Sequence, residues 1–344
     1  MRRYFLCLFC SSFLLAGRIA IEANAQAAKA QAHVAAAKAT ASEPGLYDLT
    51  PTFNLLCTER KPRQQGPPAA SGPANTANRR IPERSEWYVE PVRVFDNLYN
   101  VGTSYYVWAV TTSDGIILLN SGRDYAAEAV IEGFQKMGLD PASVKYVIIH
   151  NADPAHYGAA KLFQDRYHSR VMLSEGDWNV IAKTPEVPGR LKPLKDKDMV
   201  VTDGQKLTLG DTTLTLYVTP GNTPGTLSTV VPLKEGNERH LGLLIGGRDW
   251  DAVEQGVVYF PTEEEAIKTW ISSANRLRDI VAKANVDVFL SVRSLYDQEA
   301  GKARVLKLRK PGDHHPYVNK NALDRYLTII SKCMDAQLAW RTSR

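Results

Sequence analysis

Two kinds of hydrophobic pattern alternate along this chain from residue 87 onward. Short apolar or alternating runs predict strands, and apolar positions recurring three and four residues apart predict helices. The predicted strands are residues 92–101, 105–112, 116–120, 144–150, 171–174, 206–209, 213–218, 227–232, 240–245 and 287–291. The predicted helices are residues 126–137, 159–167, 263–284 and 323–340. The elements fall into two halves that each begin with strands, which predicts one large α/β domain and suits two sheets flanked by helices.

The first residues of the chain look like a secretory signal. Two arginines precede a short apolar core at residues 4–17, and Ala25-Gln26-Ala27 fits a cleavage site. The apolar core is too short to span a bilayer. We therefore expect residues 1–27 to be a signal peptide and the protein to be periplasmic or secreted. An uncleaved N-terminal anchor is the alternative.

Residues 28–86 carry few side chains that are large enough to form a core. Residues 28–42 are mostly Ala, Lys, Gln, Ser and Thr, and residues 60–82 are rich in proline. These compositions predict a flexible or weakly helical leader followed by a linker. The expected organisation is a low-complexity leader and Pro-rich linker at 28–86 and a folded domain at 87–344.

The composition is that of a soluble globular protein, with 44% hydrophobic residues, 23% charged residues and a formal charge of +5. The basic residues are scattered and form no stripe interleaved with aromatic residues, so we expect no nucleic-acid partner. We also expect no membrane association beyond export. The oligomeric state stays open.

The chain has four cysteines. Cys7 and Cys10 lie in the expected signal peptide, which leaves Cys57 and Cys333 in the exported chain. An oxidising compartment allows these two residues to form a disulfide. Two separate buried thiols are the alternative.

The polar loop at residues 151–157 is the first candidate for chemistry. It follows the apolar run at 144–150 and precedes the small residues that open a predicted helix. The carboxyl end of a buried strand is where α/β proteins usually place functional groups. The loop therefore supplies candidate site residues.

This loop resembles the metal-binding loop of the metallo-β-lactamase superfamily, especially that of the third subclass of these enzymes and its secreted relatives. The family's loop reads His-x-His-x-Asp-His, and the aligned residues here are Asn151, Asp153, Ala155 and His156. Five further segments resemble the family: residues 116–122, 174–178, 219–226, 290–294 and 309–317. The resemblance covers about residues 90–340 and implies an αββα sandwich, a single domain with a flexible N-terminal extension.

The resemblance also implies where zinc ligands would stand. The family's first zinc site has three histidines, and the matching residues here are Asn151, Asp153 and Asn222. The second site has one aspartate and two histidines, and the matching residues are Ala155, His156 and Arg293. Only Asp153 and His156 are good zinc ligands, and they belong to different sites. We therefore expect a degenerate metal site with no zinc and no other cofactor.

The remaining polar residues still suit a ligand. We expect the guanidinium of Arg293 to replace the metal as the positive centre of the cleft and to pair with Asp153. His156 is a candidate general base, and Tyr157 a candidate hydrogen-bond donor. The expected catalytic residues are His156, Asp153, Arg293 and Tyr157. The expected substrate-binding residues are Asn151, Asn222 and Arg293.

The other histidines near these segments are expected to be structural. Strand alternation points the side chain of His150 away from that of Asn151. His314 and His315 adjoin a proline in a predicted loop, a setting that is typical of surface residues.

Three functions stay open. The first, favoured by the polar residues that fill the site, is a metal-independent hydrolase or lyase acting on a small organic molecule with an anionic or carbonyl group. The second is a non-catalytic pseudoenzyme that binds a ligand or a protein. The third is an atypical zinc-dependent, β-lactamase-like hydrolase that holds one metal through Asp153 and His156.

Overall fold

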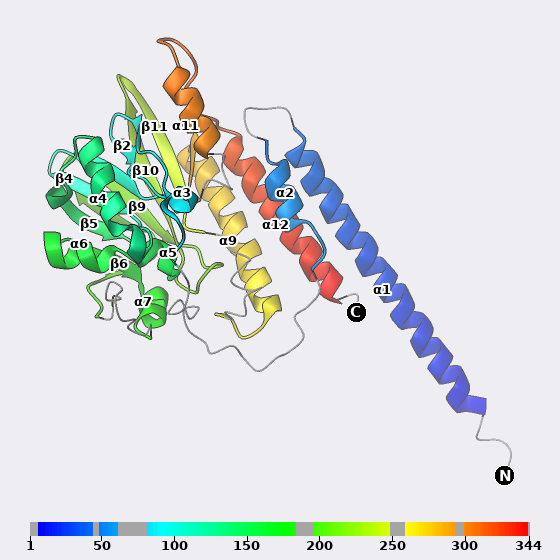
Figure 1. The fold of residues 1–344 in the computed structure, drawn as a ribbon. Coiled ribbons are helices and arrows are strands. Elements are labelled where there is room, and N and C mark those ends of the chain that lie inside the picture. Colours follow the sequence, from blue (N-terminus) through cyan, green and yellow to red (C-terminus); the bar gives the residue numbers. More distant parts are fainter. Residues whose placement is uncertain are drawn as a thin grey trace.

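Two β-sheets lie face to face in this computed structural model, which describes residues 6–43, 48–60, 81–183, 194, 196–247, 259–293 and 299–342 (Figure 1). The first sheet contains, in spatial order, β1 (Val92–Phe95), β2 (Leu98–Asn100), β3 (Trp108–Thr112), β4 (Gly115–Leu119), β5 (Val144–Ile148), β6 (Arg170–Ser174) and β7 (Met199–Val201). Strands β1 to β4 are antiparallel, and β4 to β7 are parallel.

The second sheet has the order β12-β11-β10-β9-β8. Its strands are β8 (Gln205–Leu209), β9 (Thr212–Val218), β10 (Leu227–Glu235), β11 (Glu238–Ile245) and β12 (Val288–Ser291). Neighbours are antiparallel except β11 and β12, which are parallel. The carboxyl ends of β4, β5, β11 and β12 therefore supply the loops discussed below.

Apolar side chains form a core between each pair of adjacent layers. The core between the two sheets includes Trp108, Ile117, Leu214 and Leu244. A second core joins the first sheet to α4 (Ala127–Lys136), α6 (Ala160–Tyr167) and α7 (Glu175–Ile181). A third joins the second sheet to α9 (Glu263–Ala284) and α12 (Ala322–Thr342). The predicted αββα sandwich is therefore confirmed, with α3 (Arg84–Trp87), α5 (Pro154–Tyr157) and α11 (Glu299–Leu308) as additional helices.

Helix α9 shows why the periodic pattern predicted its bounds well. The hydroxyl of Thr262 accepts a hydrogen bond from the Glu265 N–H at 3.1 Å, which caps the first turn. Three glutamates in that turn complement the positive end of the helix dipole. Asn285 ends the helix in the left-handed conformation at φ 55°. Between these signals, one apolar face packs on the second sheet.

The described part of the N-terminal extension is helical. The C-terminal part of helix α1 (Leu6–Ala41) lies alongside α12, where Ala30, Ala37 and Ala41 are buried, and its N-terminal part extends beyond α12 (Figure 1). Helix α2 (Thr50–Leu56) packs on the same surface. Small alanine side chains let two helices approach closely, and the apolar face of α12 supplies a core that the leader lacks on its own. The sequence predicted a flexible or weakly helical leader, and in the described residues 30–43 and 48–57 it forms helices that pack on α12.

Arg325 of α12 fastens the end of α1. Its guanidinium is buried and donates hydrogen bonds to the backbone carbonyls of Thr40, Ala41 and Glu43 at 3.2, 3.3 and 2.8 Å. These carbonyls lie at and just beyond the end of α1, where few backbone N–H groups remain to pair with them. Within the described residues, no helix combines the length and apolar character needed to cross a membrane. Most of the expected Pro-rich linker, residues 61–80, lies outside the described residues.

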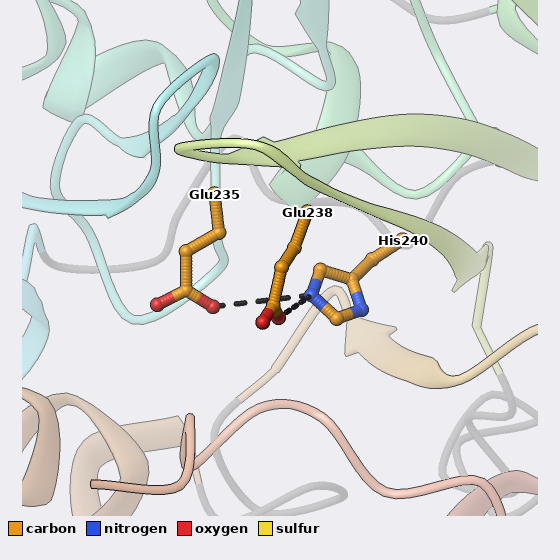
Figure 2. Close-up of side chains that lie close together, drawn as sticks. All are labelled: Glu235, Glu238 and His240. Carbon is orange, nitrogen blue, oxygen red and sulfur yellow. Dashed lines mark ion pairs between the residues drawn. The ribbon is translucent and has the colours of Figure 1, made fainter. Parts of the chain in front are cut away.

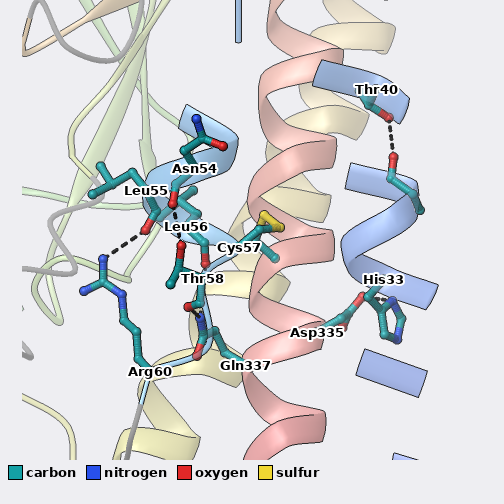
Figure 3. The surroundings of a disulfide bond; sticks show 12 residues. His33, Thr40, Asn54, Leu55, Leu56, Cys57, Thr58, Arg60, Asp335 and Gln337 are labelled. Carbon is teal, nitrogen blue, oxygen red and sulfur yellow. Dashed lines mark hydrogen bonds and ion pairs between the residues drawn. A yellow bond between two sulfur atoms is a disulfide. The ribbon is translucent and has the colours of Figure 1, made fainter. Parts of the chain in front are cut away.

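A disulfide between Cys57 and Cys333 joins the leader to α12 (Figure 3). Both residues are buried, and their Cα atoms are 4.6 Å apart. The side-chain amide of Gln337, one turn further along α12, donates to the carbonyls of Leu56 and Thr58 at 3.1 and 2.7 Å. The bridge and these hydrogen bonds hold the leader against the sandwich. Of the two alternatives for the cysteines, the structure therefore has the disulfide and not two separate thiols.

Replacing Cys57 and Cys333 together by serine should lower the free energy of unfolding by about 2–5 kcal/mol. The bridge closes a loop of 276 residues, and loop closure restricts the unfolded chain. Urea unfolding of both proteins would measure the difference. An unchanged midpoint and slope would show that the bridge does not stabilise the fold.

Candidate functional site

The candidate site lies where loops from both sheets meet. Residues 120–123 follow β4, residues 149–157 follow β5, residues 219–226 precede β10, residues 246–247 follow β11, and residues 292–293 follow β12. The carboxyl ends of adjacent parallel strands lie at one edge of a sheet, so these loops converge. They contain every residue that the sequence analysis placed in the site.

Asn151 and Asn222 meet against Gly247. A Cβ atom on Gly247 would lie 2.8 Å from Nδ2 of Asn151 and 3.3 Å from Nδ2 of Asn222. Gly247 also has φ +138°, a conformation that side chains disfavour. Asn151 donates to the carbonyl of Gly246 and accepts from the Asp153 N–H at 2.9 Å. The two amides are therefore brought together, as the sequence predicted.

Asp153 begins the short helix α5. Its carboxylate accepts from the Ala155 N–H at 2.7 Å, and Pro154 occupies the first helical position. The negative charge of Asp153 also acts on Arg123. Burial would lower the pKa of the Arg123 guanidinium, but Asp153 and Tyr105 outweigh this effect and raise it. Asp153 therefore caps the first turn of α5 and also attracts the guanidinium of Arg123.

Tyr105 gathers two guanidinium groups and a histidine. Nη2 of Arg293 donates to its hydroxyl at 2.8 Å, and Nη2 of Arg123 at 3.3 Å. The two guanidinium carbons lie 4.5 and 4.8 Å from the ring centroid, respectively, within cation–π range. The ring of His156 meets Tyr105 edge-on, with centroids 5.8 Å apart. All three partners of Tyr105 therefore come from different loops.

Backbone pairing places Tyr105 opposite Arg293. The two residues form an isolated antiparallel bridge, and the N–H of Tyr106 donates to the carbonyl of Val292 at 3.0 Å. This pairing joins the segment before β3 to the segment after β12, so it crosses from one sheet to the other. Arg293 and His156 therefore both contact the ring of Tyr105. The expected pairing of Arg293 with Asp153 stays a prediction.

Two expected site residues are buried. Tyr157 packs in the core between the first sheet and its helices, and its role as a hydrogen-bond donor to a ligand stays a prediction. His156 has no exposed surface. Its ring contacts Tyr105, which is half-buried.

His150 has the structural role expected for it. Its Nδ1 lies 3.1 Å from Oδ1 of Asn120, and its Nε2 lies 2.8 Å from the hydroxyl of Thr229. Burial, and then the neighbouring His156, lower the pKa of His150 to about 3. The imidazole is therefore neutral at physiological pH.

His314 is exposed, but His315 is buried and stacks on Phe95 with ring centroids 4.3 Å apart, so the expectation of a surface residue is wrong for His315.

Asp177 is a buried carboxyl group that the sequence analysis did not single out. It accepts from the Thr223 hydroxyl at 2.8 Å and the Gly225 N–H at 2.9 Å. Burial raises its pKa to about 7, against the lowering effect of Thr223, Gly225 and the Ala152 N–H. Asp177 thereby ties the loop before β10 to the loop that contains Asn151.

Tyr105, Arg123 and Tyr259 are the other residues that sequence reasoning missed. Burial, and then the charges of Asp153 and Asp177, raise the pKa of the Tyr259 phenol, which places it in the same electrostatic environment. Arg123 carried a usable signal, because it directly follows the segment 116–122 that resembles the family. Tyr105 had no such signal.

An apolar pocket adjoins the polar site. Its cavity volume is only about 20 Å³, which is room for about one water molecule, and Gly247 lies between it and the two asparagines. Its lining is contributed by the loop before β10, by α9 and by α12, and includes Gly221, Trp270, Leu277 and Ile330. The pocket is apolar and borders the polar residues, but it is far smaller than the pockets that hold drug-sized ligands.

The residues of the cleft do not fit two zinc ions. Ala155 offers no ligand atom, and Arg293 brings a positive charge. Asn151 uses both ends of its amide within the protein, and one oxygen of Asp153 caps α5. Only His156 and the second oxygen of Asp153 are left as good zinc donors among the matching positions.

Comparison with known proteins identifies the fold. The model of the metallo-beta-lactamase superfamily matches residues 100–235. The subclass B3 metallo-beta-lactamase BJP-1 of Bradyrhizobium japonicum is 24% identical over 74% of this chain and 95% of its own, with a TM-score of 0.62. A motif mutant of the metallo-beta-lactamase from Cronobacter sakazakii is 22% identical over 74% of this chain and 98% of its own, with a TM-score of 0.61. FEZ-1 from Legionella gormanii is 22% identical over 70% and 91%, with a TM-score of 0.59.

Asp177→Asn should change how stability depends on pH. The pKa of Asp177 is about 7 in the folded state and 3.8 as a model value, so its contribution is full below about pH 3.8 and is lost as the pH rises through 7. The pKa of His150 is about 3 against 6.5, so its contribution is present above about pH 6.5 and is lost as the pH falls. The two trends oppose each other between these limits.

With Asp177 replaced, the trend from His150 remains alone. The free energy of unfolding of the variant should therefore rise with pH more steeply than that of the wild type across this interval, as urea titrations would show. Asp279→Asn, at an exposed position of α9, is the matched control. Parallel profiles for the wild type and Asp177→Asn would contradict the expected protonation of Asp177.

Proposed function

Because the chain has the metallo-β-lactamase fold and its residues 100–235 match the model of that superfamily of hydrolases, we propose that it is an exported hydrolase or lyase that works without a metal ion. Its substrate is a small organic molecule with an anionic or carbonyl group. This molecule lies at the convergence of loops where other members of the superfamily would hold zinc.

The observation that carries this proposal is the pair of guanidinium groups on Tyr105. The phenol oxygen accepts hydrogen bonds from both Arg123 and Arg293, so its own O–H remains as a donor. All three side chains are half-buried and can reach a ligand. Two fixed cations and a phenol together suit a carboxylate or a carbonyl oxygen that gains negative charge.

The other residues complete the site in this proposal. Asn151 and Asn222 contribute amide groups beside Gly247 and hold the polar part of the ligand. Asp153 and His156 serve as the proton-exchanging groups in this proposal, and the ring of His156 is held against Tyr105. The apolar pocket lined by Trp270 and Leu277 borders the site and has room for about one water-sized group.

A non-catalytic pseudoenzyme is the second candidate. One observation favours it: the side-chain oxygens of Asn151 and Asp153 accept hydrogen bonds from backbone N–H groups of their own loop. Binding alone would need only the guanidinium pair and the pocket. The two candidates differ in whether a bound ligand is converted.

Arg293→Ala should weaken the binding of small carboxylates by at least about tenfold, because a hydrogen bond to a charged group contributes roughly 1.5–3 kcal/mol. Thermal-shift screening of a carboxylate and ester library, followed by calorimetry of the hits, would measure it. Arg293→Lys should give an intermediate affinity, since lysine keeps the charge and loses the planar fork. Arg304→Ala, exposed on α11, is the control. Equal affinities of wild type and Arg293→Ala would refute the role of Arg293.

Any turnover found in such a screen should survive removal of metal ions. The cleft lacks the donor set for two zinc ions, so dialysis against a chelator should leave the rate unchanged. Product formation, followed by mass spectrometry before and after chelation, would test this. Loss of turnover that added zinc restores would favour the atypical zinc hydrolase instead. Conversion of no bound ligand would favour the pseudoenzyme.

A further inference from the structure

A second polar cluster lies at the end of the second sheet that faces away from the cleft. Glu235 ends β10, Glu238 begins β11, and the two residues face each other across the hairpin. His240 follows two residues later on β11 (Figure 2). Strand β11 has eight residues and reaches the cleft only at its other end, roughly 23 Å away. The cluster is therefore separate from the site proposed above.

The three side chains converge on one point (Figure 2). One ligand atom from each lies within 4.8 Å of the others. Nε2 of His240 is 3.8 Å from Oε2 of Glu235 and 3.6 Å from Oε2 of Glu238. Two donors on one tetrahedral zinc ion, with bonds of about 2.1 Å, stand about 3.4 Å apart. The observed separations are therefore close to those of ligands that share an ion.

His240 is held ready as a ligand. Its Nδ1 lies 2.7 Å from Oδ2 of Asp287, and the other oxygen of Asp287 accepts from the Leu241 N–H at 3.0 Å. This fixed carboxylate favours the tautomer with the proton on Nδ1, which leaves a lone pair on Nε2. The side chain of His240 is 10% exposed, and within the described part of the chain Nε2 is buried and has no hydrogen-bond partner. A buried acceptor of this kind needs a partner.

The charges around His240 call for a cation. Three carboxylates, those of Glu235, Glu238 and Asp287, surround the ring. Arg309 pairs with the second oxygen of Glu235, so it neutralises one of them. With a neutral imidazole, two negative charges remain, which one divalent ion would balance.

Protonation of His240 is the rival explanation. An imidazolium would be expected to draw a carboxylate to about 2.7–2.9 Å, the usual length of a charged N–H···O bond. That length is found at Nδ1 but not at Nε2, where both glutamates stay 3.6 Å away or more. Nearby His315 adds no cation, because burial lowers its pKa, and its Nε2 lies 3.0 Å from the Val94 carbonyl. The spacing at Nε2 therefore suits an ion better than a proton.

We propose that Glu235, Glu238 and His240 bind a divalent transition-metal ion, for which zinc is the fitting probe. Imidazole and carboxylate oxygen are ordinary zinc ligands, and the exposed Glu238 leaves a path for entry. The ion joins the β10–β11 hairpin to Asp287, which precedes β12, and to Arg309. It stabilises the fold and takes no part in the cleft. The sequence expectation of no zinc rested on the cleft positions alone.

The test uses the full chain, freed of metal by chelation and dialysis and carrying no polyhistidine tag. Calorimetry with zinc chloride should show about one ion bound per chain, and zinc should raise the melting temperature. His240→Gln and Glu238→Gln should each weaken zinc binding by at least about tenfold, and Asp287→Asn by about 10–100-fold through the loss of ligand orientation. Glu238 is largely exposed, so its replacement should leave folding intact.

Matched variants separate this site from others. Glu264→Gln and His168→Asn, both at exposed positions, should leave zinc affinity unchanged. His156→Gln in the cleft should leave it unchanged as well, so zinc held in the cleft would be recognised by loss of binding in that variant alone. No binding at millimolar zinc, or the same affinity in His240→Gln, Glu238→Gln and wild type, would overturn the proposal.

Discussion

The buried hydrogen bonds of His150 are the interaction on which the cleft depends. One ring nitrogen meets Asn120 at the end of β4, and the other meets Thr229 on β10. The histidine therefore spans the gap between the two sheets inside an otherwise apolar core. Because both nitrogens have partners, a polar ring is tolerated there. The loop that begins at Asn151 starts from this anchored point.

Asp177 supports the same region from the side of the first sheet. Asp177 follows β6 and holds the loop before β10 through hydrogen bonds with Thr223 and Gly225. The backbone of Gly225 lies so close to Ser174 and Asp177 that a side chain at position 225 would clash with them. The hydrogen bonds of these two buried groups join loops of both sheets at the rear of the cleft. The front is built differently: there, Tyr105, Arg123 and Arg293 are joined by one phenol and are partly open to solvent. Residues that are held by their neighbours in this way keep the positions of the cationic groups fixed.

The parts of the structure that follow local patterns were predictable, and the parts that depend on distant partners were not. Residues 263–284 predicted α9 through a capping residue, an acidic first turn and a regular apolar face. The packing of α1 was not predicted, because its alanines have no core of their own and bury against a helix almost three hundred residues away. In the site, family positions located Asn151, Asn222 and Arg293, whereas the meeting of Tyr105 with Arg123 arises only when the sheets pack. The short helices α5 and α7 were hidden within motifs, since their caps, Asp153 and Ser174, are also motif residues.

The bridge between Cys57 and Cys333 also decides how mechanical tension would travel through the molecule. Both sheets lie within the 276-residue span that the bridge closes, while α1 and the last turns of α12 lie outside it. A pull on one end of the chain against the other would load the sulfur–sulfur bond and the contact between these two helices. The strands would carry little of that force. Whatever the ends are attached to, the shape of the cleft is insulated from forces applied to them.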